Sequence, residues 1–142
     1  MDDFYMRLAI NQALKSREPL KCGTVIVKNK KVIAKAYNSQ RTSHDPSAHA
    51  EIKALRRAGR RMGSKYMRGC VVYSTHEPCL MCLSALVFSE IKKLVFGIPT
   101  LEHSPKGKTI KLYIDDFLSY IPATNKFEVV KNFLKEEVRR KL

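Results

Sequence analysis

The sequence predicts an α/β fold, a three-layer α/β/α sandwich around a central mixed sheet of about five strands. Short runs of β-branched residues alternate along the chain with segments of helical apolar spacing, a pattern typical of strands covered by helices. The chain has 142 residues, and 44% of them are hydrophobic, which is enough apolar material for a packed core. Because no repeat, linker or low-complexity tract divides it, we expect residues 1–142 to form a single domain.

The N-terminal part of the chain predicts a helix followed by a hairpin. Residues 4–16 carry apolar side chains at helical spacing. The β-branched runs at 22–28 and 32–37 predict strands. A tight turn through Asn29-Lys30 is the shortest way to join them, and we expect a hairpin there.

The segment that follows predicts an amphipathic helix ending near Met62. Asp45-Pro46 is typical of a helix start, with proline at the first helical position. Apolar residues three and four apart should face the core: Ala48, Ile52, Leu55, Ala58 and Met62. Basic residues fall on the opposite side, where they form either a solvated face or a nucleic-acid contact: Lys53, Arg56, Arg57, Arg60 and Arg61.

The second half of the chain predicts three strands and two helices. Residues 70–73, 93–97 and 127–130 are short β-rich runs that we expect to form strands. The helix expected over 79–89 is apolar nearly all round and should therefore be buried. An amphipathic helix over 131–141 closes the chain.

The formal net charge is +14, from 27 basic and 13 acidic residues. Such an excess favours polyanionic partners, because each neutralised phosphate releases counterions. It also occurs as a solubility or thermostability trait. No apolar run approaches the ~20 residues of a membrane span, and residues 1–4 are acidic where a secretory signal would be basic. We therefore expect a cytoplasmic protein with no membrane partner.

Two of the four cysteines of the chain are isolated in the sequence, and the other two form a motif. Without a secretory signal, free thiols or metal ligation are favoured over disulfides. Cys22 and Cys70 are isolated in the sequence, and we expect both to be ordinary buried thiols. Cys79 and Cys82 form a C-x-x-C pair, and their spacing of three places both thiols on one helical face.

His49 completes a candidate zinc site with Cys79 and Cys82. His49 and Cys79 each lie at the start of a predicted helix, where partial positive charge favours thiolates over thiols. One imidazole and two thiolates with one open position indicate a catalytic zinc. Glu51 lies close to the ion but poorly placed to bind it. We expect Glu51 to take a proton from the attacking water and return it to the substrate.

The chain resembles the cytidine deaminase-like superfamily of zinc nucleobase deaminases. The signature H-x-E followed by P-C-x-x-C stands here in residues 45–51 (DPSAHAE) and 77–82 (EPCLMC), and the likeness covers most of residues 4–97. The resemblance implies Zn²⁺ as cofactor and hydrolytic removal of an exocyclic amine from a nucleobase. By analogy with relatives whose active sites lie near a subunit interface, it also implies a homodimer.

Within that superfamily the two strings are similar to the purine-handling branch, which includes tRNA adenosine deaminases and guanine deaminases. By this resemblance Asn38 corresponds to a position that hydrogen-bonds the base, and an amide can donate and accept at once. Ala50, between His49 and Glu51 in the H-A-E string, is expected to contact the substrate as well. The alternative interpretation of Asn38 is a turn residue at the end of the second strand.

Three features of the sequence favour different substrates. Bacterial tRNA adenosine deaminases usually carry a basic, glycine-rich loop after the strand at 93–97, whereas this chain has IPTLEH at 98–103. Asp115 and Asp116 resemble an Asp-Asp-Phe-like stretch that guanine deaminases carry over the active site, or they form an ordinary turn or helix cap. The positive charge favours RNA, because a small neutral base needs no positive surface.

We therefore predict that the chain deaminates adenosine to inosine in tRNA. Deamination of a free purine base or nucleoside is the first alternative. A catalytically silent RNA-binding subunit with a structural zinc is the second, with His44 or His76 as a fourth ligand. The presence of Glu51 argues against that second alternative.

Overall fold

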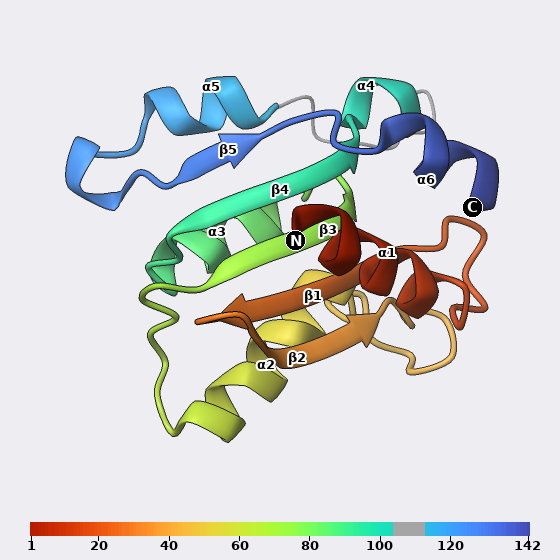
Figure 1. Ribbon diagram of the computed structural model, residues 1–142, viewed down its shortest axis with the longest axis horizontal. Coiled ribbons are helices and arrows are strands. Elements are labelled where there is room, and N and C mark those ends of the chain that lie inside the picture. The colour runs from red at the N-terminus through yellow and green to blue at the C-terminus, as the bar shows by residue number, and fades with distance from the viewer. Residues whose placement is uncertain (104–112) are drawn as a thin grey trace.

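A computed structural model describes residues 1–103 and 113–142 of the chain. Its strands are β1 (Gly23–Lys28), β2 (Lys31–Tyr37), β3 (Val71–His76), β4 (Lys93–Ile98) and β5 (Glu128–Val130). Over the described residues they form a five-stranded sheet in the order β2-β1-β3-β4-β5 (Figure 1). β1 is antiparallel to β2 and β3, whereas β3, β4 and β5 run parallel, so the sheet is mixed as predicted.

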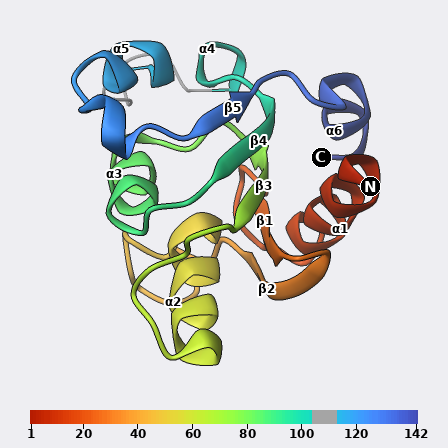
Figure 2. The ribbon, with the colours of Figure 1, turned by 60° about the vertical axis from the view of Figure 1, so that its left-hand side comes forward.

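Helices cover both faces of this sheet. They are α1 (Asp2–Ala13), α2 (Ala50–Met62), α3 (Leu80–Phe88), α4 (Thr100–His103), α5 (Ile114–Ser119), the 3₁₀ turn η1 (Ala123–Asn125) and α6 (Lys135–Lys141). Figure 2 shows α1 and α6 on one face and α2, α3 and α5 on the other. Each face has its own apolar cluster between helices and sheet. The predicted three-layer α/β/α sandwich is therefore confirmed.

The hairpin between β1 and β2 forms at the predicted turn. Asn29 and Lys30 both lie in the left-handed region, with φ of 48° and 62°, as a two-residue type I′ turn requires. β1 pairs with β2 on one side and with β3 on the other, and its residues are buried except for Lys28. β2 is left as the edge strand of the sheet.

α2 begins later than the sequence predicts. The predicted start at Asp45-Pro46 is wrong, because the Asp45 carboxylate accepts hydrogen bonds from the N–H and the hydroxyl of Ser47, at 2.8 and 2.7 Å. That arrangement stabilises a turn instead of a helix. The helix starts only after His49, its N-cap residue, and α3 likewise starts after its N-cap residue Cys79. Two of the predicted zinc ligands therefore lie at helix N-termini.

The face of α2 that packs on the sheet differs in part from the predicted stripe. Ala48 and Ala58 are buried as predicted, but Ile52, Leu55 and Met62 are only half-buried. The buried residues of the helix are Ala50, Glu51, Ala54 and Ala58. Three alanines let the helix approach the sheet closely, and that approach carries the carboxylate of Glu51 into the interior.

α3 is not buried all round, contrary to the prediction. Its exposed fraction reaches 79% at Phe88 and 37% at Met81, because the helix lies in an outer layer with one side toward solvent. The buried residues of α3 are Cys82, Leu83, Leu86 and Val87. None of the helices in residues 1–103 and 113–142 combines the length and apolar character that a bilayer-spanning segment needs.

Candidate active site

The two helix N-termini bring His49, Cys79 and Cys82 together. The Sγ atoms of Cys79 and Cys82 each lie 3.6 Å from Nδ1 of His49 and 3.7 Å from one another. A tetrahedral zinc ion with Zn–S of about 2.3 Å and Zn–N of about 2.1 Å has ligand–ligand separations of about 3.8 Å between sulfurs and about 3.6 Å between sulfur and nitrogen. The spacing of the three side chains therefore fits a zinc ion.

The charge of this triad also suits a cation. The pKa of Cys79 is lowered to about 4, chiefly because of its side-chain hydrogen bond with Cys82 and further because it is hydrogen-bonded to His49. The same contact raises the pKa of Cys82. Contact with Cys79 raises the pKa of His49 in turn. A divalent cation would neutralise the sulfur charge and displace these protons.

The described residues supply no fourth ligand to the triad. The one metal-binding group of histidine, cysteine and carboxylate side chains found among them has three members. His76 lies instead within 2.9 Å of the Thr75 hydroxyl and 3.5 Å of the Cys22 sulfur. His44 is an exposed loop residue with a φ of 49°. A three-ligand site leaves one coordination position for solvent or substrate, as catalytic zinc sites do.

Glu51 stands beside the triad on the first turn of α2. Its side chain is only 4% exposed. Oε1 accepts a hydrogen bond of 2.7 Å from the Ser74 hydroxyl, and Oε2 lies 3.6 Å from the Cys82 sulfur. Burial raises the pKa of Glu51, an effect that the Ser74 hydrogen bond partly offsets. A raised carboxyl pKa suits a group that both takes up and releases a proton near neutral pH.

A pocket of about 360 Å³ opens over these residues. His49, Glu51 and Cys79 line its floor together with Ala50, and further walls come from the loops before β1 and after β2. Its volume lies within the range of about 300–1,000 Å³ that is usual for small-molecule sites. The pocket can therefore admit one base with part of its sugar.

Comparison with known proteins identifies the family. Residues 1–98 match the family of the cytidine and deoxycytidylate deaminase zinc-binding region. The chain belongs to this family. It is thus a zinc-dependent hydrolytic deaminase, and the triad described above occupies the region by which the family is defined.

Three relatives of this deaminase indicate how far the similarity extends. A tRNA-specific adenosine deaminase of Aquifex aeolicus (strain VF5) is 33% identical over 142 residues, covering 94% of either chain. A guanine deaminase of Bacillus subtilis (strain 168) is 40% identical over 85 residues, 60% of this chain and 54% of that protein. A solved structure from studies of A-to-I editing by tRNA:A34 deaminases at the wobble position has a TM-score of 0.82 and 30% identity, covering 99% of both chains.

Two of the predicted substrate contacts line the pocket of the deaminase. Ala50 is fully buried at the start of α2. The Asn38 amide accepts a hydrogen bond from the Cys22 N–H at 2.9 Å and donates one to the Leu20 carbonyl at 2.7 Å. An amide has two N–H donors and two acceptor lone pairs, so one of each remains. Asn38 therefore shapes the wall of the pocket and keeps one donor and one acceptor for a substrate.

The other two predicted substrate contacts lie elsewhere. Asp115 and Asp116 are exposed on α5 and do not line the pocket. Asp115 accepts a hydrogen bond of 2.6 Å from the Lys131 ammonium. Both aspartates lie in the first turn of α5, where the positive end of the helix dipole stabilises negative charge. The structure does not bring them together with the triad.

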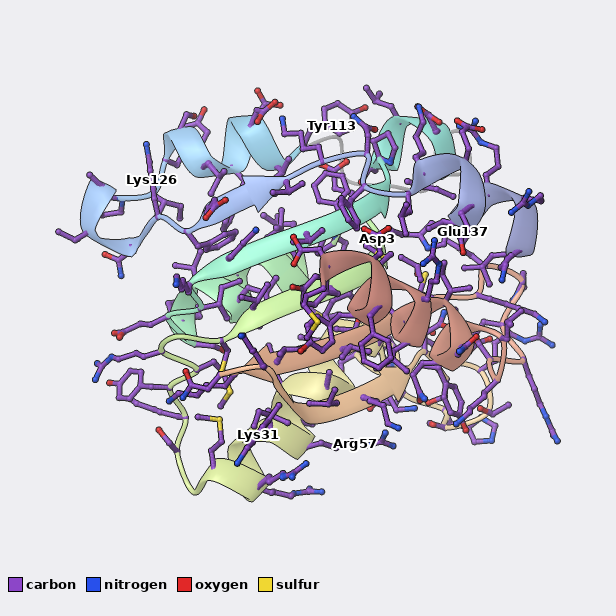
Figure 3. All side chains as sticks on the ribbon, in the orientation of Figure 1. Asp3, Lys31, Arg57, Tyr113, Lys126 and Glu137 are labelled. Carbon is purple, nitrogen blue, oxygen red and sulfur yellow. The ribbon has the colours of Figure 1, made fainter. Side chains whose placement is uncertain are left out.

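The predicted RNA-contacting stripe on α2 divides into two groups. Arg57 donates to the Lys35 carbonyl, and Arg61 donates to the carbonyls of Val32 and Ile33 at 3.0 and 3.1 Å. Figure 3 places Arg57 beside the β2 edge of the sheet. These two arginines therefore cover an edge strand that would otherwise offer free acceptors.

The remaining stripe residues face the loop that follows β2. Lys53 donates to the Ser39 hydroxyl at 2.8 Å, and Arg56 lies 3.8 Å from the Asp45 carboxylate in an exposed ion pair. Arg60 is exposed, and no described residue forms an ion pair or a hydrogen bond with its side chain. Arg60 is therefore the arginine of the stripe whose guanidinium no described residue engages.

The pocket also contains residues that sequence reasoning missed. Cys22, expected to be an ordinary buried thiol, is half-buried and lines the pocket, whereas Cys70 is fully buried as expected. Glu77 is buried and accepts hydrogen bonds from the backbone N–H groups of Thr100 (2.6 Å) and Ile114 (3.0 Å). It therefore ties the starts of α4 and α5 to the loop that carries Cys79. No sequence pattern signals these roles.

Proposed function

We propose that the deaminase converts adenosine to inosine in tRNA. Similarity to a tRNA-specific adenosine deaminase over 94% of either chain carries this proposal. Similarity to the guanine deaminase covers only 60% of this chain. A net charge of +14 is in keeping with a polyanionic substrate.

In the proposed mechanism His49, Cys79 and Cys82 hold Zn²⁺ and Glu51 moves the protons. When bound, the ion supplies Lewis-acid activation of the attacking water. Because Ser74 occupies Oε1 of Glu51, Oε2 is the oxygen that takes the proton from water. Glu51 delivers this proton to the ring nitrogen N1, then takes the remaining proton of the added hydroxyl and passes it to the departing amine, so that adenosine and water give inosine and ammonia.

The substrate contacts belong to the same proposal. The base enters the pocket between Asn38 and Ala50 with its exocyclic amine toward Glu51. Of the basic residues of α2 that the sequence singled out, Arg56 and Arg60 meet the flanking phosphates, whereas Lys53, Arg57 and Arg61 are held by other parts of the chain. Asp115 and Asp116 are left without a role in this arrangement.

We also propose that the deaminase acts as a homodimer in the cytoplasm, where tRNA is found. Met81 and Phe88 of α3 are exposed apolar side chains on a single helix, and exposed apolar patches mark association surfaces. A second copy of the chain is the proposed occupant of this face. Light scattering of the purified protein measures the mass directly, and the mass of a monomer at all concentrations contradicts the dimer.

Deamination of a free purine is the second candidate function. The 40% identity to a guanine deaminase over 85 residues favours it. It differs from the first candidate in substrate only, since both use the same metal and the same acid side chain.

One experiment separates the two candidates. The zinc-loaded protein is incubated separately with tRNA, with free nucleosides and with free bases, and released ammonia is measured. The tRNA is then sequenced for inosine. Ammonia release from tRNA with inosine at a defined position supports the first candidate, and ammonia release confined to guanine or a free nucleoside contradicts it.

A further inference from the structure

Two acceptor atoms in the wall of the pocket lack hydrogen-bond partners. Among the described residues, the buried side-chain atoms without a partner are Oε2 of Glu18 and Oε1 of Gln40. Both side chains line the pocket that contains the triad and Glu51. A buried acceptor without a donor is unfavourable and uncommon in native proteins. Each would therefore be stabilised by a donor that enters the pocket with the substrate.

Glu18 is held rigidly in this position. Its side chain is 6% exposed, and its Oε1 accepts a hydrogen bond from the Arg41 backbone N–H. Its own N–H donates to the Ser16 hydroxyl at 3.1 Å, and that hydroxyl donates to the Asn38 carbonyl at 3.0 Å. The loop after α1 is thereby joined to the loop after β2, and Oε2 is the atom of the carboxylate that stays unpaired.

The chemistry of an RNA nucleotide narrows the choice of donor. Adenine has acceptors at N1, N3 and N7, and its strong donor is the exocyclic amine, which has to lie at Glu51 to react. Within an RNA chain the 3′ and 5′ oxygens are esterified, so the 2′-hydroxyl is the remaining donor of the sugar. A phosphate group offers no donor and would be repelled by a carboxylate.

We propose that Glu18, assisted by Gln40, accepts a hydrogen bond from the 2′-hydroxyl of the target nucleotide and so makes the deaminase selective for RNA over DNA. This inference rests on the proposed function, because it requires a ribose attached to the base. It gives a role to a buried carboxylate in a strongly basic protein.

The test compares three short stem-loop RNAs that differ only at the target adenosine. One carries the natural ribose, one a 2′-deoxyribose and one a 2′-fluoro group, which lacks the hydroxyl donor while favouring an RNA-like sugar pucker. For the wild type we expect kcat/KM to fall about 10- to 100-fold on both altered RNAs, the usual size for a lost hydrogen bond to a charged group.

The decisive variant is Glu18→Gln, which keeps the size of the side chain and an oxygen for the Arg41 N–H but replaces Oε2 by a donor. We expect its kcat/KM on the natural RNA to fall as far as the wild type falls on the deoxy RNA, with little further loss on the altered RNAs. Gln40→Met removes the second acceptor and should reduce the same selectivity in part. Glu136→Gln, at an exposed carboxylate of α6, is the matched control and should behave as wild type.

Zinc content and the midpoint of thermal unfolding are measured for every variant, so that loss of folding is recognised; Gln40→Met carries the test if Glu18→Gln fails to fold. Equal wild-type activity on all three RNAs overturns the proposal while leaving tRNA deamination intact. A Glu18→Gln variant that loses activity but keeps the wild-type ratio between natural and deoxy RNA also overturns it. Activity confined to free guanine, which has no ribose, overturns both proposals together.

Discussion

At the scale of single residues, the buried carboxylate of Glu51 carries the chemistry of the proposed mechanism. Its two oxygens have different surroundings, because Ser74 donates to Oε1 while Oε2 faces the sulfur of Cys82. The Ser74 hydrogen bond fixes the orientation of a carboxyl group whose pKa is raised by burial. A fixed carboxylate loses little entropy when it meets the substrate.

Replacing Glu51 by glutamine tests this role. The amide oxygen can still accept from Ser74, so the fold and the zinc content should be retained. Proton transfer is lost, and kcat should fall by about 100- to 10,000-fold, the contribution typical of general acid–base catalysis. Ammonia release is measured beside metal analysis and thermal unfolding; near wild-type turnover by Glu51→Gln would exclude Glu51 as the proton carrier.

Cys82 and Cys70 form a matched pair of buried thiols. Both are fully buried, but only Cys82 lies in the triad. Cys82→Ala should lose most of its zinc and, because metal binding couples to folding, part of its stability. Cys70→Ala should keep its zinc and lose about 1 kcal/mol or less of unfolding free energy. Equal zinc contents in the two variants would remove Cys82 from the metal site.

At the scale of helices and strands, the sequence predicts which elements form better than it predicts their surfaces. The hairpin turn at Asn29-Lys30 was predictable because two residues are the shortest connection between these strands, and the type I′ turn matches the strand twist where type I or II turns would force the strands apart. The start of α2 was not, because Asp45 stabilises either a helix cap or a turn, and its contact with Ser47 decides for the turn. The exposure of Phe88 was also hidden, since periodicity does not state whether an apolar helix is covered on both sides.

The packing of α1 on β1 depends on a glycine that the sequence analysis did not single out. A Cβ atom built on Gly23 would overlap the carbonyl oxygen of Ala9 and lie 2.5 Å from the backbone nitrogen of Ala13. Both are backbone atoms of α1 or its end, so neither can move without shifting the helix. Gly23→Ala should therefore lower the free energy of unfolding by about 1–3 kcal/mol, the usual range for overpacking.

Urea denaturation of Gly23→Ala and of a control glycine variant measures this effect. Gly63 is the control, because no atom lies within 4 Å of a Cβ placed there. Any strain caused by a substitution at Gly63 would come from its backbone φ of 63° and not from a steric overlap. Gly63→Asn tolerates that conformation and should change stability only slightly. A Gly23→Ala protein as stable as wild type would mean that α1 does not pack on β1 as closely as described.

At the scale of the whole molecule, the metal triad and the pocket wall differ in how far a sequence can predict them. His49, Cys79 and Cys82 stand in two short strings, and their spacing alone suggests a site. Glu18 and Gln40 come from loops that meet only in the folded chain, and neither has a neighbour in sequence that hints at a ligand. A residue whose hydrogen-bond partner is a ligand can be recognised only in the folded structure, when the partner of every buried polar atom is known.

The net charge of the whole molecule predicts that RNA binding weakens with salt, but the structure changes which arginines should contribute to that salt dependence. Arg57 and Arg61 are held by the carbonyls of β2, whereas Arg56 lies 3.8 Å from the Asp45 carboxylate and Arg60 has no side-chain partner among the described residues. If RNA binds along α2, each phosphate contact contributes about 0.7–0.9 to the slope of log K against log salt concentration. Replacing Arg56 and Arg60 by glutamine should therefore lower that slope by about 1 to 2.

Replacing Arg57 and Arg61 should mainly weaken the packing of α2 on the sheet edge, so that unfolding free energy falls more than the salt slope. Binding isotherms at several salt concentrations and thermal unfolding of both double variants distinguish the two groups, and equal effects of both pairs on the slope would show that all four arginines meet phosphate.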